Sequence, residues 1–531
     1  MRIFVRREES TPPGAENRSR PHSYHRNPGG PADAIVVVVD GARRRKKTEA
    51  AGGNLSEVGS IHTIDEVIEG NEMMEKRDRP ERNVQREATG QIQSWQPVQP
   101  HLLRVNAAAR RSGQTLFTSL LHHVDVAALK RAFRRQRRAA SPGADGVTMA
   151  MYEQNLESNL QGLHDRVHAG HYWPQPVVRV QIPKPDGGKR PLGIPALEDK
   201  LLQSAVAEVL SAVYEADFLD YSYGFRPARS AHQALAALEK SVMTQYVNYV
   251  LDVDIASFFD SVDHGWLMRM LSHRIADRRV LRLIERWLKA GILESGRRIQ
   301  SETGTPQGSG ISPLLANVFL HYIFDLWIAQ QRRRARGHIV VCRYADDLVL
   351  GFQYKDQAQK LFAALRERFA KFGLSLHEGK TRLIEFGRFA SENRSKAGLR
   401  RPETFNFLGF THYCSRTRSG RFTVKRKTQA KRLNRKLVAV RVEMKRRRHR
   451  PLAEQYTWLS HVLNGHYRYY GVIFNARSLN AFYEGVKRAW FQSLRKRSQR
   501  SRMNWERFHR ILATFALPKP IIHQSWYRAI A

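Results

Sequence analysis

Cysteine is almost absent from this sequence, which has only Cys342 and Cys414 among its 531 residues. Two cysteines exclude a disulfide framework and a zinc site built from cysteine pairs. No apolar run approaches the about 20 residues that a membrane-spanning helix requires. The first residues also lack the apolar stretch of a signal peptide. We therefore expect a reduced, cytoplasmic protein that does not enter a membrane.

Acidic residues are also scarce, because 89 Lys and Arg stand against 49 Asp and Glu, a formal net charge of +40. Such an excess is typical of proteins that bind nucleic acids. Its distribution is uneven. Residues 416–531 contain 29 basic and 4 acidic residues, whereas residues 1–90 contain 16 and 15. Most of the excess charge therefore lies at the C-terminal end.

The tetrapeptide Tyr344-Ala345-Asp346-Asp347 lies between two short apolar runs, residues 339–342 and 348–350. This pattern predicts a strand, a tight turn and a second strand, with two adjacent carboxylates at the tip. Like charges held so close need a cation between them, and enzymes that transfer phosphoryl groups commonly use two divalent metal ions. An Asp-Asp pair alone is weak evidence, because such pairs are common in solvated turns.

A third carboxylate comes from the apolar run that begins at Tyr249 and predicts a buried strand. Asp254 at the end of that strand is the better candidate, and Asp252, on the same face by period two, is its rival. Asp260 and Asp263 resemble caps of a helix that begins near His264. Oxygen ligands without a cluster of His or Cys favour Mg²⁺ over zinc.

These residues carry a resemblance to the group II intron-encoded proteins, which are reverse transcriptases and maturases. The Tyr-Ala-Asp-Asp turn and Asp254 match the family's catalytic motifs. Further blocks follow in the family's order from about Thr115 onward: residues 182–195, 222–227, 305–317, 378–381 and 405–410.

The resemblance implies an α+β right-hand polymerase, with fingers and a palm of antiparallel sheet and helices, followed by an α-helical thumb or maturase domain. It implies an RNA-directed DNA polymerase and maturase that assists splicing and copies the intron during retrohoming by two-metal-ion nucleotidyl transfer. The expected cofactors are two Mg²⁺ ions, and the expected partners are group II intron RNA, target DNA and dNTPs. The oligomeric state stays open, with a homodimer as one alternative. The expected location is the cytoplasm of a bacterial-type cell, with the nucleoid or a ribonucleoprotein.

Carried onto this sequence, the resemblance assigns catalysis to Asp254, Asp346 and Asp347, and metal binding to these three and Ile255. Nucleotide binding is assigned to Lys184, Arg190, Phe258, Phe259, Gln307 and Lys380. For the two phenylalanines, core packing is the commoner fate of such a pair. The alternative is that one ring excludes a ribose 2′-hydroxyl, and the spacing from Asp254 slightly favours Phe259. For Lys184, Arg190, Gln307 and Lys380 the alternative is an ordinary surface loop or helix cap.

The sequence predicts four segments. Residues 1–90 are rich in Pro, Gly and both charge signs and are expected to be disordered. Residues 91–165 form a helical extension, 166–415 the fingers and palm, and 416–531 the basic helical domain. Leu433, Leu437, Val440 and Met444 have helical spacing within a run, residues 425–450, that holds 13 basic residues and one acidic residue. The expected RNA contacts are Arg134, Arg135, Arg137, Arg138, Lys425, Arg426, Lys427, Lys431, Arg432, Arg435 and Lys436, and a solvated basic face is the alternative.

Two other functions remain as alternatives: a splicing-only RNA-binding maturase whose polymerase is idle, and a defence or retron-type reverse transcriptase. The three aspartates argue against the first, and the basic C-terminal region argues against the second. Relatives often carry a C-terminal endonuclease of the His-Asn-His type with cysteine pairs. Because no cysteine pair follows the basic region, we expect that domain to be absent.

Overall fold

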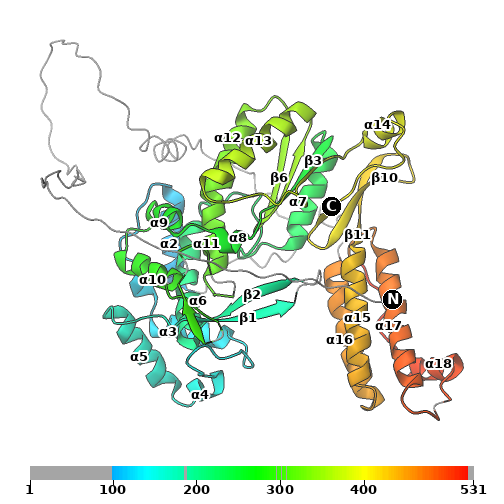
Figure 1. Ribbon diagram of the computed structural model, residues 1–531, viewed down its shortest axis with the longest axis horizontal. Helices are drawn as coiled ribbons and strands as arrows, with labels where there is room; N and C mark the ends of the chain where they lie inside the picture. Colours follow the sequence, from blue (N-terminus) through cyan, green and yellow to red (C-terminus); the bar gives the residue numbers. More distant parts are fainter. Residues whose placement is uncertain are drawn as a thin grey trace, which may run out of the picture. The chain divides into compact units, whose positions relative to one another are not determined.

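The computed structural model describes residues 99–183, 188–294, 296–300, 302–305, 308–500 and 502–523 (Figure 1). The expected disordered extension, residues 1–90, lies outside these ranges. Within them, helices combine with sheets whose strand pairs are antiparallel except between β1 and β4. The predicted α+β class is therefore confirmed.

The first part of the described chain is helical, and residues 91–98 of the expected helical extension lie outside the described residues. Its elements are α2 (Pro100–Arg111), η1 (Leu121–His123), α3 (Val126–Arg135), α4 (Met149–Glu153) and α5 (Leu156–His168). α2 and α3 pack on α6 (Leu197–Tyr214). The Asp125 carboxylate begins α3 by accepting the Ala128 N–H, and Leu129 and Phe133 are buried on one face. The other face leaves Arg134 and Arg135 exposed.

A four-stranded sheet follows, with the order β2-β1-β4-β5. β1 (Val177–Pro183) pairs with β2 (Lys189–Ile194) in an antiparallel hairpin, and with β4 (Ile292–Glu294) in parallel, while β5 is Arg297–Ile299. The hairpin predicted from the turn signal after Pro183 is therefore confirmed. The tip of the hairpin, residues 184–187, lies outside the described residues.

The central sheet has the order β6-β7-β3-β8 and is antiparallel throughout. Its strands are β3 (Tyr249–Asp254), β6 (Ile339–Tyr344), β7 (Asp347–Phe352) and β8 (Arg382–Glu385). Side chains alternate across the sheet, so Leu251 and Val253 enter one core and Val250 enters another. Burial on both faces explains why these strands read as continuous apolar runs.

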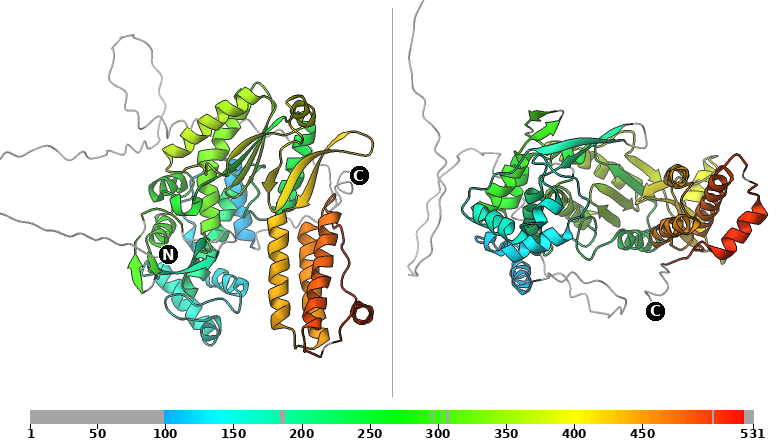
Figure 2. Two further views of the ribbon diagram at one scale, coloured as in Figure 1. Left: turned by 45° about the vertical axis from the view of Figure 1, so that its right-hand side comes forward. Right: turned by 90° about the horizontal axis from the view of Figure 1, so that it is seen from below.

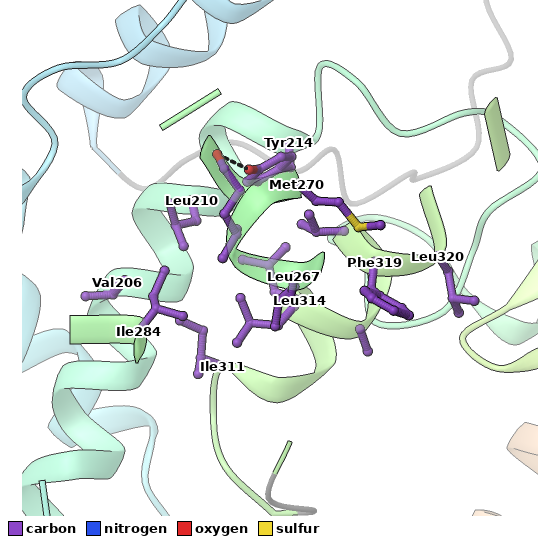
Figure 3. Close-up of a cluster of buried hydrophobic side chains, with 14 of the residues drawn as sticks. Val206, Leu210, Tyr214, Leu267, Met270, Ile284, Ile311, Leu314, Phe319 and Leu320 are labelled. Atoms are coloured by element: carbon purple, nitrogen blue, oxygen red, sulfur yellow. Dashed lines mark hydrogen bonds between the residues drawn. The ribbon is translucent and has the colours of Figure 1, made fainter. Parts of the chain in front are cut away.

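Helices cover both faces of the central sheet (Figures 1 and 2). One core joins it to α13 (Lys355–Lys371) and to a long helix made of α11 (Ser312–Leu320), the π-helical turn η2 (His321–Asp325) and α12 (Leu326–Arg334). The same core contains α9 (His264–Ser272) and α10 (Arg278–Leu288), and Figure 3 shows Leu267 and Ile284 from these helices beside Leu314. The other core contains α7 (Ala231–Thr244). The short helix α8 (Phe258–Ser261) follows β3.

The long helix Ser312–Arg334 has the length and composition of a helix that could cross a membrane. However, 83% of its apolar window is buried inside the protein. Such burial is what a core helix shows, and Leu315, Val318 and Phe319 accordingly pack in the core beside the central sheet.

The C-terminal part begins with α14 (Ala390–Lys396) and a three-stranded sheet of β9 (Phe405–Phe407), β10 (Phe410–Arg416) and β11 (Phe422–Thr428). The helices α15 (Ala430–Arg446), α16 (Leu452–Tyr470) and α17 (Ala476–Arg495) then run side by side, and α18 (Trp505–Thr514) follows (Figure 2). The predicted boundary at residues 415/416 falls inside the β10–β11 hairpin. The helical segment therefore begins at Ala430, and β10 and β11 share a core with the central sheet.

Asp277 connects the N-terminal helices to α10. Its carboxylate accepts the N–H groups of Leu120 (2.7 Å) and Leu121 (3.0 Å), and it also caps α10 through Arg279 N–H (3.0 Å). Burial alone would raise the pKa of Asp277, but these backbone donors outweigh it and hold the pKa below its usual range.

We predict that Asp277→Ala destabilises the protein at pH 7 by about 2–3 kcal/mol, because buried N–H groups on two elements lose their acceptor. A carboxylate with a lowered folded-state pKa stabilises above its unfolded pKa of about 3.9. The difference between variant and wild type should therefore shrink as the pH falls below about 4 in thermal melts. The matched control is Asp125→Ala, which removes the cap of α3 alone and should cost about 1 kcal/mol. Equal losses in the two variants would contradict the prediction.

Candidate active site

Two of the three aspartates predicted to be catalytic, Asp254 and Asp347, lie opposite each other in the central sheet. The register pairs Asp254 at the end of β3 with Asp347 at the start of β7. Tyr344 pairs with Asp347, so Ala345 and Asp346 form the turn between β6 and β7. Ala345 has φ 56°, the left-handed conformation that tight two-residue hairpin turns need. The predicted strand, turn and strand are therefore confirmed, with Asp254, Asp346 and Asp347 at one edge of the sheet.

The segment after α13 completes this edge. The Asp254 carbonyl accepts the His377 N–H at 2.8 Å, and its N–H donates to Thr381 Oγ1 at 3.3 Å. Lys380 Nζ lies 3.4 Å from Asp254 Oδ2. The structure thus brings Lys380, a residue predicted from the sequence, to the carboxylates. Ile255 is buried beside them and bridges Leu376.

Asp252, the rival of Asp254, is placed differently. It lies one pleat further along β3, and its carboxylate is 3.9 Å from Arg382 Nη2. Burial raises the pKa of Asp252 to about 6, and the charge of Asp254 adds to this rise while Arg382 opposes it. The register places Asp252 opposite Val349 and Asp254 opposite Asp347, so Asp254 is the one of the two that lies at the turn. Of the two aspartates predicted to cap a helix, Asp263 does so, since its side chain accepts the Trp266 N–H at the start of α9. Asp260 does not cap that helix but lies within α8.

Negative charge accumulates at the turn. Desolvation of the Asp347 carboxylate by the surrounding protein raises its pKa to about 7, and the charges of Asp346 and Asp254 add to this rise. Part of the side chain still reaches solvent. Hard oxygen donors that repel one another fit a divalent cation, whose charge would remove the repulsion. Among the described residues, no three His, Cys, Asp or Glu side chains converge on one point as a ready-made metal cage. Any ion here would therefore complete its coordination with other oxygens.

Sequence reasoning missed Arg343, the residue that supports the turn. Its side chain is fully buried, with Nε 2.8 Å and Nη2 2.5 Å from the two carboxylate oxygens of Asp325. Nη1 donates to Asn317 Oδ1 at 2.9 Å and to the Ala345 carbonyl at 3.3 Å. Burial would raise the pKa of Asp325, but the Arg343 guanidinium outweighs it and holds the pKa below its usual range. The sequence contains a signal for this ion pair: an arginine lies directly before the acidic turn, and a single aspartate, Asp325, lies within an apolar helical segment.

A second segment locks the turn from the side. Residues 221–224 run beside Arg343, whose carbonyl accepts the Tyr223 N–H at 2.8 Å. The Gly224 carbonyl accepts Asn317 Nδ2 at 2.7 Å. A Cβ at Gly224 would lie only 2.2 Å from the Ala345 nitrogen, so this position has room for glycine alone. The block at residues 222–227 therefore packs directly on the acidic turn.

The predicted nucleotide contacts are only partly described. Lys184 and Gln307 lie outside the described residues, and Arg190 is described only as a β2 residue paired with Ile182. Phe259 is partly exposed after Asp254. The prediction for Phe258 is corrected, because its ring is 2% exposed and packs in the core. Of the two phenylalanines, only Phe259 can contact a ligand at this edge.

A cavity of about 260 Å³ lies between the first sheet and α8, and its lining includes Arg179, Gly193, Asp260 and Gly304. The Thr305 N–H donates to the Phe259 carbonyl at 2.7 Å. Gly308 (φ 114°) approaches β2 so closely that a Cβ would lie 2.2 Å from the Gly193 oxygen. The block at residues 305–317 therefore joins the first sheet to the segment that carries Phe259.

The basic residues predicted to bind RNA divide into three groups. The prediction for Arg426 is wrong, because its side chain is 1% exposed and pairs with Glu239 across the β11–α7 contact. Arg135 pairs with Glu208, and Arg138 with Glu153, both at the surface. The others face solvent or are half-buried: Arg134, Arg137, Lys425, Lys427, Lys431, Arg432, Arg435 and Lys436.

Three exposed residues of α15, Arg432, Arg435 and Lys436, line a groove of about 660 Å³ whose other side is α16, with His461, His466 and Tyr470. Arg432 is close enough to the acidic turn to oppose the raised pKa of Asp347. The Tyr469 hydroxyl donates to the Leu408 carbonyl at 2.8 Å. Tyr469 and Tyr470 also pack on Phe410, so this tyrosine block serves mainly as packing.

Comparison with known proteins agrees with this geometry. Residues 182–412 match the family of reverse transcriptases, described as RNA-dependent DNA polymerases. Protein YkfC of Escherichia coli (strain K12) is 36% identical over 241 residues, which cover 40% of this chain and 63% of that protein. The group II intron-encoded protein LtrA of Lactococcus lactis subsp. cremoris is 40% identical over 192 residues, 36% of this chain and 30% of the relative. Nuclear intron maturase 1, mitochondrial, of Arabidopsis thaliana is 28% identical over 118 residues, 22% of this chain and 16% of the relative.

The central sheet, its acidic edge and the blocks around it thus form a reverse transcriptase domain. The resemblance to group II intron-encoded reverse transcriptases and maturases, drawn from the motifs, is confirmed by these relatives. The aligned segments span less than two thirds of the first two relatives, 63% and 30% of their lengths.

We predict that Asp325→Ala destabilises the protein by about 3–5 kcal/mol, because it leaves the Arg343 guanidinium buried without its counter-charge. The midpoint of thermal unfolding at pH 7 is the measurement. Asp356→Ala is the matched control, since its partner Arg336 is 3.3 Å away at the surface and such pairs contribute about 0–1 kcal/mol. Similar midpoints for the two variants would show that the buried pair does not support the domain.

Proposed function

We propose that this protein is the RNA-directed DNA polymerase and maturase of a group II intron, which assists splicing of the intron RNA and copies it into DNA during retrohoming. The observation that carries the proposal is the pairing of Asp254 with Asp347 across β3 and β7, beside Asp346 and within reach of Lys380. Three carboxylates and a lysine at one open edge suit nucleotidyl transfer. In this proposal the first sheet and the helices around it are the fingers, the central sheet is the palm, and α15–α17 are the thumb.

The reaction proposed here is attack of a primer 3′-hydroxyl on the α-phosphate of a dNTP, with pyrophosphate leaving. Two Mg²⁺ ions, when bound, would lower the pKa of the hydroxyl and neutralise the leaving group. Asp254, Asp346 and Asp347 are the residues that would hold them. Desolvation is the main cause of the raised pKa of Asp347, and the charges of Asp346 and Asp254 contribute a repulsion that bound cations would relieve. The buried Arg343 pair keeps the turn in place while substrates exchange.

Lys380 has a separate role in this proposal. Its ammonium lies 3.4 Å from Asp254 Oδ2, yet the side chain is 58% exposed and free to swing toward solvent. A lysine so placed can offer its charge to the phosphates of a nucleotide at the acidic edge. Lys184, Arg190 and Gln307 are proposed to contact the same nucleotide from the fingers.

The maturase part of the proposal rests on charge. Three exposed basic residues of α15 line the groove with α16, and Glu443 is the one acidic residue within α15 itself. Phosphates are the natural partners of such a surface, and binding should weaken steeply with salt. Intron RNA, target DNA and dNTPs are the proposed partners, and the cytoplasm is the proposed location.

We predict that Asp346→Asn reduces DNA synthesis more than about 10³-fold, equivalent to about 4 kcal/mol of transition-state stabilisation. RNA affinity should stay within about twofold, because the substitution removes no cation that could contact a phosphate. The measurement is extension of a labelled DNA primer on an RNA template with Mg²⁺, together with filter binding of that RNA. Asp165→Asn, at an exposed position of α5 outside both the acidic turn and the basic surfaces, is the control. Absence of synthesis by the wild type, with RNA binding intact, would favour a splicing-only maturase.

We predict that Phe259→Ala raises ribonucleotide incorporation about tenfold or more, because this ring is the partly exposed one of the two that follow Asp254 in the chain. Phe258→Ala should leave the sugar preference unchanged and should instead lower stability by about 3–5 kcal/mol, as expected for a buried ring. The measurement is the ratio of kcat/KM values for a dNTP and the matching rNTP. An unchanged ratio in Phe259→Ala would remove this residue from sugar selection.

A further inference from the structure

The central sheet has a second end, opposite the acidic turn, where a different set of residues gathers. The register brings together the start of β3 at Tyr249, the start of β6 at Ile339, and the end of β7 at Phe352. β8 also ends here, at Glu385 opposite Tyr249. At about 3.3 Å per residue, the six-residue strands separate this end from the acidic turn by about 17 Å. A ligand at this end would therefore not touch the reacting atoms.

Arginines from several elements surround this end. The last turn of α12 and the loop after it provide five basic or titratable side chains: Arg332, Arg333, Arg334, Arg336 and His338. Arg388, which follows β8, is exposed at the same end. We call these six residues the arginine cluster.

The cluster encloses a cavity of about 520 Å³. Arg332, Arg333, Arg336 and His338 line it together with the amides of Gln245 and Gln353, which come from the ends of α7 and β7. Three guanidinium groups and two amides around one cavity provide many hydrogen-bond donors. Such a lining suits phosphate oxygens, which accept hydrogen bonds and carry negative charge.

The contacts within the cluster leave much of its charge without a counter-charge. Arg332 Nε donates to the Ile339 carbonyl at 3.0 Å, which orients that side chain without neutralising it. Arg336 reaches Asp356 at 3.3 Å, and both side chains are more than half exposed. Asp356 is the one acidic residue paired with the cluster within the part of the chain that the structure describes. Arg333 and Arg334 are exposed.

Aromatic rings lie among these arginines. The Arg336 guanidinium lies 4.1 Å from the centroid of Tyr354, and that of Arg388 lies 4.9 Å from the centroid of Tyr246. Tyr246 is 53% exposed, and Phe389, the residue after Arg388, is 49% exposed. Exposed rings beside arginines are the combination on which unpaired bases stack.

A simpler explanation is that the arginines of α12 complement its helix dipole. That explanation covers residues in the last turn, where each cation contributes about 0.3–1 kcal/mol. It does not cover Arg388, His338 or the glutamine amides, which come from other elements and face the same cavity or the same end. Nor does it explain the exposed rings. A ligand with both phosphates and bases accounts for all of these features.

We propose that the arginine cluster is a second polynucleotide site, which binds a single-stranded segment through its phosphates while the acidic turn holds the primer and template. Arg336 and the three arginines of the last turn of α12 contact the backbone, and the Tyr246 ring stacks on a base. The proposal rests on the polymerase function proposed above, since it assumes that a polynucleotide already occupies the acidic edge. The site would anchor a distant part of the same bound molecule, RNA or DNA, during synthesis.

The test uses the full chain loaded with an equimolar RNA–DNA primer–template hairpin, so that the acidic edge is occupied. Fluorescein-labelled 20-nucleotide oligouridylate, or the matching oligodeoxythymidylate, is then titrated and followed by anisotropy between 50 and 200 mM KCl. Arg333→Glu/Arg334→Glu should weaken binding at least tenfold at 50 mM salt. The salt slope should fall by about 1.4, as two lost phosphate contacts on a single strand predict. The extension rate of the loaded primer should stay within twofold.

The matched control is Arg278→Glu/Arg282→Glu on α10, which changes the net charge equally on another surface and should bind within twofold of the wild type. Arg333→Gln/Arg334→Gln, which adds no negative charge, should show a weaker loss in the same direction. The comparison of the RNA and DNA oligonucleotides tells which polynucleotide the site prefers. Equal binding by the cluster and control variants, or no binding by the loaded wild type, would overturn the proposal. Failure of the wild type to extend the primer would instead count against the polymerase function, because the titration does not depend on turnover.

Discussion

The buried ion pair between Arg343 and Asp325 is the interaction on which the acidic edge depends. It joins the last residues of β6 to the π-helical turn of the long core helix, and its third donor group reaches the carbonyl of Ala345 inside the turn. A buried pair is costly to form and far more costly to break on one side. Repulsion between the two adjacent carboxylates destabilises the turn. The ion pair and the hydrogen bond to the Ala345 carbonyl hold the turn in place against this repulsion.

Buried polar contacts also join the sheets to the C-terminal helices. Arg426 forms an ion pair with Glu239 inside the protein. The side-chain amide of Asn475, which is fully buried, donates to Thr428 Oγ1 and to the Tyr470 carbonyl. These contacts anchor β11, the end of α16 and the start of α17 to one another, and they join β11 to α7. Basic residues beyond them, such as Arg435 and Lys436, remain at the surface. Position within the fold, more than residue type, decides which cations can meet a phosphate.

The sequence predicted the parts of the site that depend on short-range pattern. Asp346 and Asp347 follow from the strand–turn–strand signal, and Asp254 from a carboxylate at the end of an apolar run. The parts that depend on tertiary packing were not accessible. Nothing in the local sequence separates buried Phe258 from half-exposed Phe259, or buried Arg426 from exposed Lys427. The predicted boundary at 415/416 was placed where positive charge increases. The chain changes from strand to helix only at Ala430. The two positions differ because β11 already contains several basic residues.

The strand order β6-β7-β3-β8 also sets when the site can exist during protein synthesis. Asp254 emerges from the ribosome well before its partners, and Thr381 and β8, which bind and flank β3, follow about 130 residues later. At roughly 5–20 residues per second, that interval lasts about 6–26 s. Until β7 emerges neither side of β3 can be paired, and the side that binds β8 stays unpaired through the whole interval. Translation speed over this stretch, and any chaperone that shields the waiting strand, would then influence how much active protein each message yields.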